Sequence, residues 1–168
     1  MNDYKSILVG IAEAEIGIRE QGGNNRGGRI VAYQKATWLE PDAWPWCAAF
    51  VCWCIKDWLG VPGVAESIGV GNVEKWRPKT ASAFDFLQWA KEKDLHVLGE
   101  GAEVHAGDLV IFDFSHIGIV VEDALKGSQF IQTVEGNTNG KGDRDSTSGD
   151  GVWCKKRPRT LARNFIRL

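Results

Sequence analysis

The chain has 168 residues, of which 43% are hydrophobic and 25% charged, and its formal net charge is −2. This length and composition fit one soluble globular domain that spans residues 1–168 and has a full hydrophobic core. The nearly neutral charge argues against nucleic acid as the main partner, because phosphate binding needs clustered positive charge, and no stretch approaches the roughly 20 apolar residues of a membrane span.

The first half of the chain has the periodicity of helices. Apolar residues at helical spacing predict an amphipathic helix over residues 3–16, and a weaker pattern after a glycine-rich loop predicts another over 29–35. A continuous apolar segment predicts a buried helix over residues 47–59, which a following glycine and proline end. Thr80 is suitably placed to cap a further helix that runs to about residue 93.

The second half changes to short runs of β-branched and aromatic residues, bounded by glycine and polar clusters. These runs predict strands over residues 108–113, 116–121, 129–135, 152–156 and 164–167. Helices followed by strands are typical of the α+β class, in which helices pack on one face of an antiparallel sheet. We therefore expect N-terminal helices packed on a C-terminal antiparallel sheet.

The four cysteines are Cys47, Cys52, Cys54 and Cys154. The amino terminus lacks the features of a secretory signal, so we expect synthesis in the cytoplasm and free thiols rather than a disulfide framework. Cys52 and Cys54 lie two apart on a predicted helix and would point in different directions, unlike a zinc knuckle. The sequence therefore predicts no metal and no cofactor.

Three residues with catalytic chemistry stand at the ends of predicted elements. Cys47 begins the buried helix, His116 begins one strand and Glu135 ends the next. If these strands pair across their turn, His116 faces residue 134 or, after a shift of one residue, Glu135 on the same face. Asn137 follows two positions later and is expected to project to the same side. Backbone N–H groups at the helix start would stabilise a Cys47 thiolate and the oxyanion formed when it attacks an amide.

Each of these residues alone has a simpler interpretation. Cys47 would be a small buried hydrophobe, His116 a surface or capping residue, and Glu135 a turn residue. Their joint occurrence in suitable elements favours a nucleophilic hydrolase.

The same segments resemble the motifs of a known family. Trp-Cys-Ala-Ala-Phe-Val at 46–51, His-Ile-Gly-Ile-Val at 116–120 and Glu-Gly-Asn-Thr at 135–138 resemble the nucleophile, histidine and acidic motifs of the CHAP family. These are cysteine- and histidine-dependent amidohydrolases and peptidases of the papain-like superfamily. The resemblance implies a papain-like fold and hydrolysis of peptidoglycan, at the muramyl–alanine amide or within the peptide stem or bridge.

The resemblance also implies roles for individual residues. Cys47 would be the nucleophile, and His116 would act first as base and then as acid. Glu135 would orient the imidazole, with Asn137 as a supporting group or substitute third member. Binding would have to come from the cleft itself, for which Trp44, Trp46 and Trp153 are the candidate contacts.

Small members of this kind resemble phage or prophage endolysins, monomers that a holin releases to the cell wall. An interbacterial effector countered by an immunity protein and a cytoplasmic cysteine protease or deamidase remain alternatives. The acidic loop over residues 143–150 only faintly resembles a calcium site and is interpreted as a solvated loop.

The carboxyl terminus is strongly basic. Its last 14 residues carry six basic and no acidic side chains, namely Lys155, Lys156, Arg157, Arg159, Arg163 and Arg167. We expect them on the solvated outer face of a terminal strand, with a patch for an anionic polymer as the alternative.

Overall fold

A computed structural model describes residues 3–141 and 149–168, so most of the predicted loop over 143–150 lies outside the described residues. The helices are α1 (Asp3–Ala14), α2 (Gly28–Gln34), α3 (Cys47–Gly60), α4 (Val64–Ser67), α5 (Val73–Trp76) and α6 (Asp85–Glu92). The strands are β1 (His96–Gly99), β2 (Leu109–Phe112), β3 (Ile117–Val120), β4 (Phe130–Thr138), β5 (Gly151–Pro158) and β6 (Ala162–Arg167). A short 3₁₀ turn, Arg159–Leu161, joins β5 to β6.

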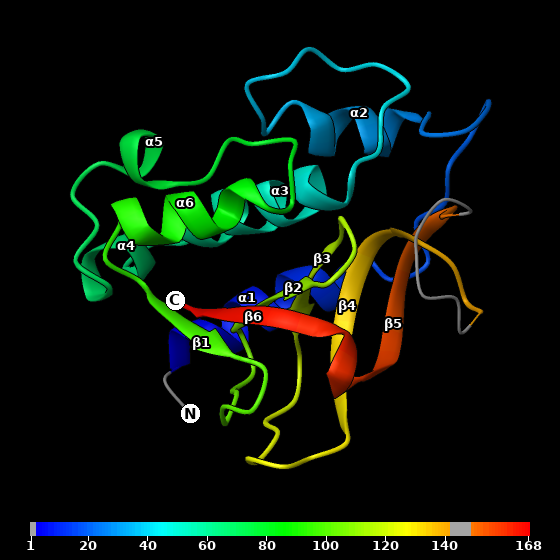
Figure 1. The fold of residues 1–168 in the computed structure, drawn as a ribbon. Helices are drawn as coiled ribbons and strands as arrows, with labels where there is room; N and C mark the ends of the chain where they lie inside the picture. The colour runs from blue at the N-terminus through cyan, green and yellow to red at the C-terminus, as the bar shows by residue number, and fades with distance from the viewer. Residues whose placement is uncertain (1–2, 142–148) are drawn as a thin grey trace.

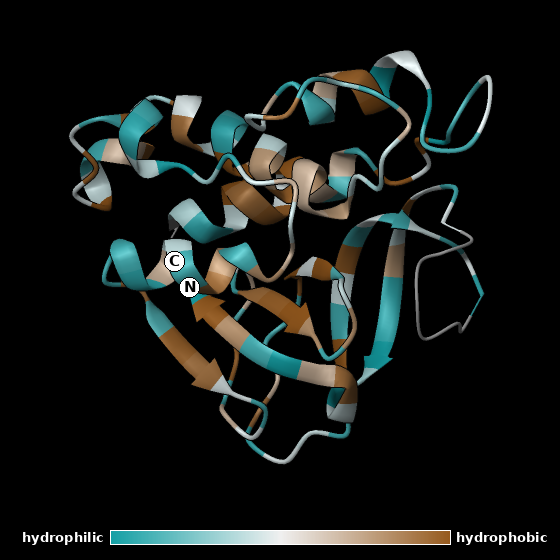
Figure 2. Ribbon diagram, turned by 45° about the horizontal axis from the view of Figure 1, so that its top comes forward, coloured by the Kyte–Doolittle hydropathy of each residue, from teal (hydrophilic) through white to brown (hydrophobic). Residues whose placement is uncertain are grey.

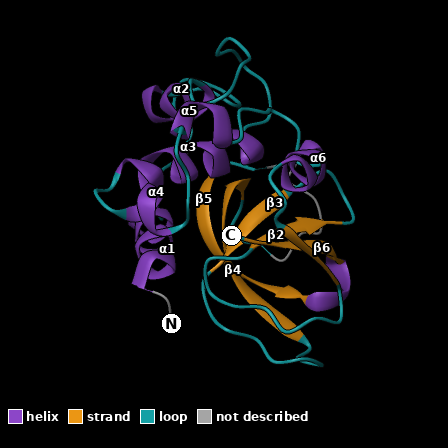
Figure 3. Cartoon of the chain, turned by 90° about the vertical axis from the view of Figure 1, so that its left-hand side faces the viewer, coloured by secondary structure: helices purple, strands orange, loops and turns teal. Residues whose placement is uncertain are grey.

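The strands form one sheet in the order β1-β6-β2-β3-β4-β5, and the paired neighbours are antiparallel. Helices lie to one side of this sheet, as Figures 1 and 3 show from two directions. The predicted α+β class, with N-terminal helices packed on a C-terminal antiparallel sheet, is confirmed.

The two faces of the sheet are buried in different hydrophobic clusters. One face, with Leu109, Ile119 and Val134, packs against α1, α2, α3 and α6. The other, with Val110 and Val120, belongs to a second, smaller cluster within the curved sheet. Figure 2 shows hydrophobic segments in α3 and the central strands, whereas β4 and β5 carry long hydrophilic stretches.

Helix α3 lies at the centre of the larger cluster, as its apolar sequence predicts. Its residues from Cys47 to Cys52 are all buried, and it contacts α1, α2, β3 and β4. At its far end, Trp58 Nε1 donates to the carbonyl of Tyr4 at 2.7 Å and ties the helix to α1. This burial fixes the start of α3 relative to the sheet.

The helix predicted to begin near Thr80 begins later. Helix α6 starts at Asp85, and the Thr80 hydroxyl accepts from the Ser82 amide at 3.0 Å and donates to the Asp85 carboxylate at 2.9 Å. Thr80 therefore stabilises the preceding turn instead of capping the helix. Elements α4, α5 and β1 were not predicted, because each has four residues and lacks the apolar run that marks the equally short β2 and β3.

The basic carboxyl terminus is not a uniformly solvated face. Lys155, Arg157 and Arg159 are buried, with 7%, 2% and 5% of their surface exposed. Lys156 and Arg163 are exposed. The prediction of a solvated basic face is wrong for the buried three, because their side chains bind carbonyl and carboxylate oxygens inside the sheet.

Candidate active site

Cys47 is the first residue of α3 and has 5% of its surface exposed, whereas Cys52 and Cys54 on the same helix are wholly buried. The preceding residue, Trp46, is the N-cap and supplies no side-chain acceptor to the helix. Backbone N–H groups in the first turn of a helix have no intrahelical partner. Cys47 therefore stands where such donors are left for another acceptor.

Close packing of β4 on α3 sets the position of this helix start. A Cβ added to Gly136 would lie 2.6 Å from Phe50 Cβ and 2.7 Å from Trp46 Cζ3. Any side chain at Gly136 would push β4 away from α3, so a glycine is required there. The contact brings Glu135 and Cys47 into the same region of the molecule.

His116 lies immediately before β3 and has no exposed surface. Its Nε2 is 2.8 Å from Oε2 of Glu135. The ring stacks on Phe114 and Phe112, with centroids 5.6 and 5.7 Å away. The predicted contact between His116 and Glu135 is thus confirmed, and the aromatic rings hold the imidazole plane.

The second nitrogen of His116 is left for Cys47. Nδ1 is buried and makes no hydrogen bond to the described residues. Although burial disfavours the imidazolium, the interactions with Cys47 and then Glu135 raise the pKa of His116 to about 9. Since Nε2 is engaged by Glu135, Nδ1 is the nitrogen left for an interaction with the thiol.

The strand register that joins His116 to Glu135 differs from the predicted one. Val134 pairs with Ile119 rather than with His116, so the strands are offset by three residues from the prediction. Glu135 reaches His116 diagonally across Gly118, where an added Cβ would lie 2.7 Å from Glu135 Cγ. A long side chain can make such a diagonal contact, and the glycine leaves the space for it.

Glu135 is completely buried and is held by three further hydrogen bonds. Arg157 donates through Nε to Oε1 at 3.0 Å and through Nη2 to Oε2 at 2.6 Å. Thr133 donates its hydroxyl to Oε1 at 2.6 Å. Burial alone would raise the pKa of Glu135, but the hydrogen bonds from His116 and Arg157 lower it to about 2. The carboxylate is therefore ionised and fixed in orientation.

A β-bulge places Asn137 differently from the prediction. The pairing of β4 with β5 shifts between Glu135 and Thr138, and Asn137 has a left-handed φ of 55°. Its carbonyl and amide oxygens lie against Gly149, and within the described part of the chain it makes no hydrogen bond to the other predicted site residues. Thr138 is instead connected to Glu135 through Arg157, whose Nη2 donates to the Thr138 hydroxyl at 3.3 Å.

The three predicted tryptophan contacts have different surroundings. Trp46 is wholly buried, donates to Glu20 at 2.9 Å and stacks on Tyr33. It therefore offers no surface to a substrate, and its role is to pack the start of α3. Trp44 is half-buried and donates to a nearby carbonyl. Trp153 is half-buried and pairs directly with Glu135 across β4 and β5.

All four cysteines are free thiols. Burial raises the pKa of Cys52 to about 12 and that of Cys54 well above its ordinary value. Cys154 is exposed on β5, and partial burial also raises its pKa. Of these thiols, Cys47 is the one whose interaction with His116 raises the pKa of the imidazole.

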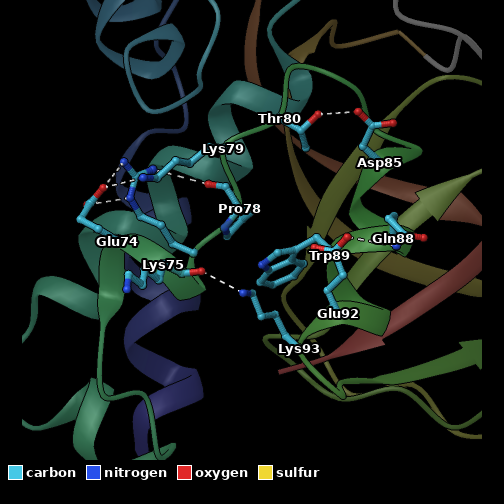
Figure 4. A pocket seen from close by; sticks show the side chains of 11 residues that line it. Glu74, Lys75, Pro78, Lys79, Thr80, Asp85, Gln88, Trp89, Glu92 and Lys93 are labelled. Carbon is cyan, nitrogen blue, oxygen red and sulfur yellow. Dashed lines mark hydrogen bonds and ion pairs between the residues drawn. The ribbon is translucent and has the colours of Figure 1, made fainter.

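A separate hollow of about 370 Å³ lies between α5 and α6. Figure 4 shows that its polar groups pair with one another, with Lys79 2.9 Å from Glu74 and Thr80 2.9 Å from Asp85. Its lining includes neither Cys47 nor His116. The hollow is therefore not part of the candidate active site.

Across residues 3–141 and 149–168, no group of three or more histidine, cysteine, aspartate or glutamate side chains is arranged to hold a metal ion. Among the helices of these same residues, none has the length and apolar character needed to cross a membrane.

Comparison with known proteins agrees with this geometry. The CHAP domain profile matches residues 39–137, which is more than half of the chain and includes Cys47, His116 and Glu135. Arg157 lies beyond the matched residues. A search of curated proteins found no match. The chain belongs to the CHAP domain family of cysteine- and histidine-dependent amidohydrolases and peptidases, and this membership implies a peptidoglycan hydrolase of the amidase or peptidase type.

Proposed function

We propose that this protein cleaves an amide bond of peptidoglycan, with Cys47 as nucleophile, His116 as the proton-transfer group and Glu135 as the group that orients His116. The observation that carries the proposal is the position of the His116 ring. Glu135 binds Nε2 at 2.8 Å, and the interaction with Cys47 contributes to the raised pKa of His116. A nucleophile, a base and an orienting group are the parts of covalent hydrolysis.

The first half of the reaction forms a thioester. The Cys47 thiolate attacks the amide carbonyl carbon, and the C–N bond then breaks. The His116 imidazolium supplies the proton that the departing amine needs. Because the pKa of His116 is raised to about 9, the ring is protonated at neutral pH and can act as this acid.

The second half returns the enzyme to its starting state. Neutral His116 takes a proton from a water molecule, and the resulting hydroxide adds to the thioester carbonyl. The C–S bond breaks, a carboxylic acid leaves and the Cys47 thiolate is regenerated beside the imidazolium. Glu135 accepts the hydrogen bond from Nε2 throughout and keeps the ring in one orientation.

The negative oxygen formed in each half needs hydrogen-bond donors. Backbone N–H groups at the start of α3 point away from the helix and are not capped by the side chain of Trp46. Donors of this kind stabilise an oxyanion without having to reorganise. We assign this role to the first turn of α3.

Replacing Cys47 by alanine tests the nucleophile. Cys47→Ala should abolish the clearing of purified peptidoglycan suspensions while the circular dichroism spectrum stays unchanged. Cys54→Ala is the matched control, because it removes a thiol from the same helix away from His116, and it should keep most of the activity. Undiminished clearing by Cys47→Ala would refute the assignment.

The cleaved bond follows from the products. We propose cleavage at the N-acetylmuramoyl-L-alanine amide or within the peptide stem or bridge, and mass spectrometry of digested peptidoglycan distinguishes them. New free amino groups on the muramyl-linked alanine would identify an amidase, and cuts further along the peptide an endopeptidase. Intact peptidoglycan after prolonged digestion would exclude both.

We also propose that Trp153 contacts the substrate, because it is partly exposed and directly opposite Glu135. Replacing it by alanine should raise KM more than it lowers kcat. An unchanged KM would place Trp153 outside the binding surface.

We propose that the protein acts as a phage-type lysin on the cell wall, and its membership of the CHAP domain family supports the wall as the place of action. Bacteria that express it should lyse when a membrane-permeabilising holin is co-expressed and should keep growing without one. Lysis that is independent of the holin would contradict this setting.

A further inference from the structure

Arg157 is a buried arginine next to the proposed catalytic residues. It lies on β5, has 2% of its surface exposed and points toward Glu135 on the neighbouring strand. Its Nε and Nη2 bind the two different oxygens of Glu135, at 3.0 and 2.6 Å. A guanidinium that engages both carboxylate oxygens fixes the carboxylate plane as well as its distance.

The bonds to Glu135 divide between its two oxygens. Oε1 accepts from Arg157 and Thr133, and Oε2 accepts from Arg157 and faces His116 Nε2. A carboxylate bound at both oxygens cannot rotate without breaking several hydrogen bonds in the buried interior. The direction of Oε2, and with it the direction of the imidazole, therefore depends on Arg157.

Arg157 and His116 also share the same aromatic surroundings. The guanidinium carbon lies 5.4 Å from the ring centre of Phe112 and 5.8 Å from that of Phe114. The imidazole stacks on these two rings, with centroids 5.7 and 5.6 Å away. The two phenyl rings thus set the spacing between guanidinium and imidazole, which indicates a defined geometry rather than a chance ion pair.

We propose that Arg157 is a positioning residue that holds Glu135 as an anion in one orientation, so that Glu135 binds His116 Nε2 and directs Nδ1 toward Cys47. The inference rests on the proposed function for the roles of Cys47 and His116. Arg157 itself does not touch the reacting atoms. It acts through Glu135.

Arg157 also balances the charge of the buried cluster. The buried cluster contains Arg157, Glu135, His116 and Cys47, and with all four ionised it has no net charge. Without the guanidinium, the cluster would either hold an unbalanced negative charge or lose it by protonation of Glu135, and a buried unpaired charge is costly. Either response weakens the thiolate–imidazolium pair.

Two substitutions separate the shape of the guanidinium from its charge. Arg157→Met keeps a long side chain but removes both the positive charge and the planar guanidinium. Arg157→Lys keeps the charge but cannot bind both carboxylate oxygens in the same two-pronged way. We expect kcat on purified peptidoglycan to fall about 10- to 100-fold in the methionine variant, with KM changed by less than about threefold. The lysine variant should recover part of this loss of kcat. If the methionine variant does not fold, the kcat of the lysine variant, which should lie below that of the wild type, takes its place as the test.

A double substitution tests whether Arg157 acts through Glu135. In a Glu135→Gln background there is no carboxylate to hold, so adding Arg157→Met should lower kcat by less than about twofold. Full additivity of the two losses would overturn the proposal, because it would mean that Arg157 acts independently of Glu135.

Arg159→Met is the matched control. Arg159 is as deeply buried, but its guanidinium binds the backbone carbonyls of Glu100, Ala102 and Leu125 rather than a carboxylate. This variant should have a lower Tm and an unchanged kcat. A kcat loss equal to that of Arg157→Met would show that any buried arginine near the carboxyl terminus is equally important and would overturn the proposal.

A readout that needs no cell wall separates this inference from the proposed function. The rate at which iodoacetamide alkylates Cys47, followed by peptide mass spectrometry between pH 5 and 10, reports the thiolate directly. We expect Arg157→Met to slow alkylation at neutral pH about tenfold or more relative to the wild type. A wild type that leaves peptidoglycan intact but shows this difference would refute the proposed substrate and keep the role of Arg157. Identical alkylation profiles and equal kcat in both proteins would refute the role of Arg157.

Discussion

Among the described residues, two buried glutamates, Glu15 and Glu135, each accept hydrogen bonds from one arginine at both carboxylate oxygens, and the remaining partners of the two differ. Around Glu15, Arg29 donates to the two carboxylate oxygens at 2.7 and 2.6 Å, and Tyr33 donates its hydroxyl as well. Around Glu135, Arg157 does the same and His116 takes the place of the tyrosine.

The third partner decides what each cluster can do. Burial and the bond to Glu15 raise the pKa of Tyr33, so its hydroxyl stays protonated in the physiological range. The interactions with Cys47 and Glu135 outweigh burial and raise the pKa of His116 to about 9. Of these two side chains, only His116 therefore gains and loses a proton at a pH near 9, where Tyr33 stays protonated.

The comparison shows that a buried glutamate–arginine pair is in itself a structural device. The Glu15 cluster joins the end of α1 to α2, and Tyr33 stacks on Trp46 beside the start of α3. In the Glu135 cluster, the same arginine–carboxylate hydrogen bonds fix the glutamate that orients His116, the proposed proton-transfer group. The difference in chemical role comes from His116, which stands where the other cluster has Tyr33, and from the neighbouring thiol of Cys47.

The largest expected effect comes from removing one charge in each cluster. Glu135→Gln should lower kcat roughly 100- to 10,000-fold, because the imidazole loses its oriented acceptor. Glu15→Gln should instead lower Tm and leave kcat within about threefold of the wild type. Both are measured by peptidoglycan clearing and thermal unfolding. Equal losses of activity would mean that the two clusters are not functionally distinct.

A smaller loss of kcat is expected when the space that Gly118 leaves for the Glu135 side chain is filled. An added methyl group on Gly118 would lie 2.7 Å from Glu135 Cγ, so Gly118→Ala should displace the carboxylate from His116 and lower kcat about 10- to 100-fold. Gly99→Ala is the control, since an added Cβ there meets nothing within 4 Å. A fully active Gly118→Ala would show that the diagonal contact is not needed.

The pH dependence of stability should also separate the clusters. The pKa of His116 is raised to about 9 from its ordinary value of 6.5, so its stabilising contribution is complete below pH 6.5 and is lost as the pH rises toward 9. The pKa of Glu135 is lowered to about 2 from 4.5, so its contribution is present above pH 4.5 and is lost as the pH falls toward 2.

Urea unfolding of the wild type between pH 6.5 and 9 should therefore show decreasing stability, and His116→Gln should flatten this decrease. The Tyr33 cluster should contribute no slope in that interval, since the tyrosine does not titrate there. A slope that persists in His116→Gln would assign the effect to another group.

The smallest effect on activity is expected for Arg29→Met. The Arg29 side chain is 41% exposed, against 2% for Arg157, so solvent screens its ion pair and the loss of stability should be about 1 kcal/mol or less. Activity should stay within about twofold. A large loss of kcat would indicate that the Glu15 cluster also positions Cys47.

The sequence was sufficient for the longer helices, for strands β2 to β6 and for the contact between His116 and Glu135, because local patterns indicate all of these. It did not indicate α4, α5 or β1. Apolar runs defined α3 and the central strands. Cys47 begins α3 and His116 directly precedes β3, whereas Glu135 lies inside β4 rather than at the strand end that the sequence predicts. The register between β3 and β4 was predicted incorrectly, since it depends on how the intervening turn closes. The bulge at Asn137 and the gap above Gly118 depend on the neighbouring strands and α3 in the same way.

Arg157 was missed for a different reason. A run of lysines and arginines near a terminus normally indicates a solvated face. The available signal was the alternation along β5, where Lys155 and Arg157 are buried while Cys154 and Lys156 are exposed. Without the strand pairing, the sequence does not show which side of β5 faces Glu135.

The most direct test of the account is the titration of His116 by nuclear magnetic resonance in the wild type and in Cys47→Ala. With the thiol present, the imidazole should stay protonated until the pH approaches about 9. Without it, the ring should lose its proton at a distinctly lower pH, because a partner that raises its pKa is gone. Identical titration curves in the two proteins would show that Cys47 and His116 do not act as a pair, and the proposed mechanism would fail.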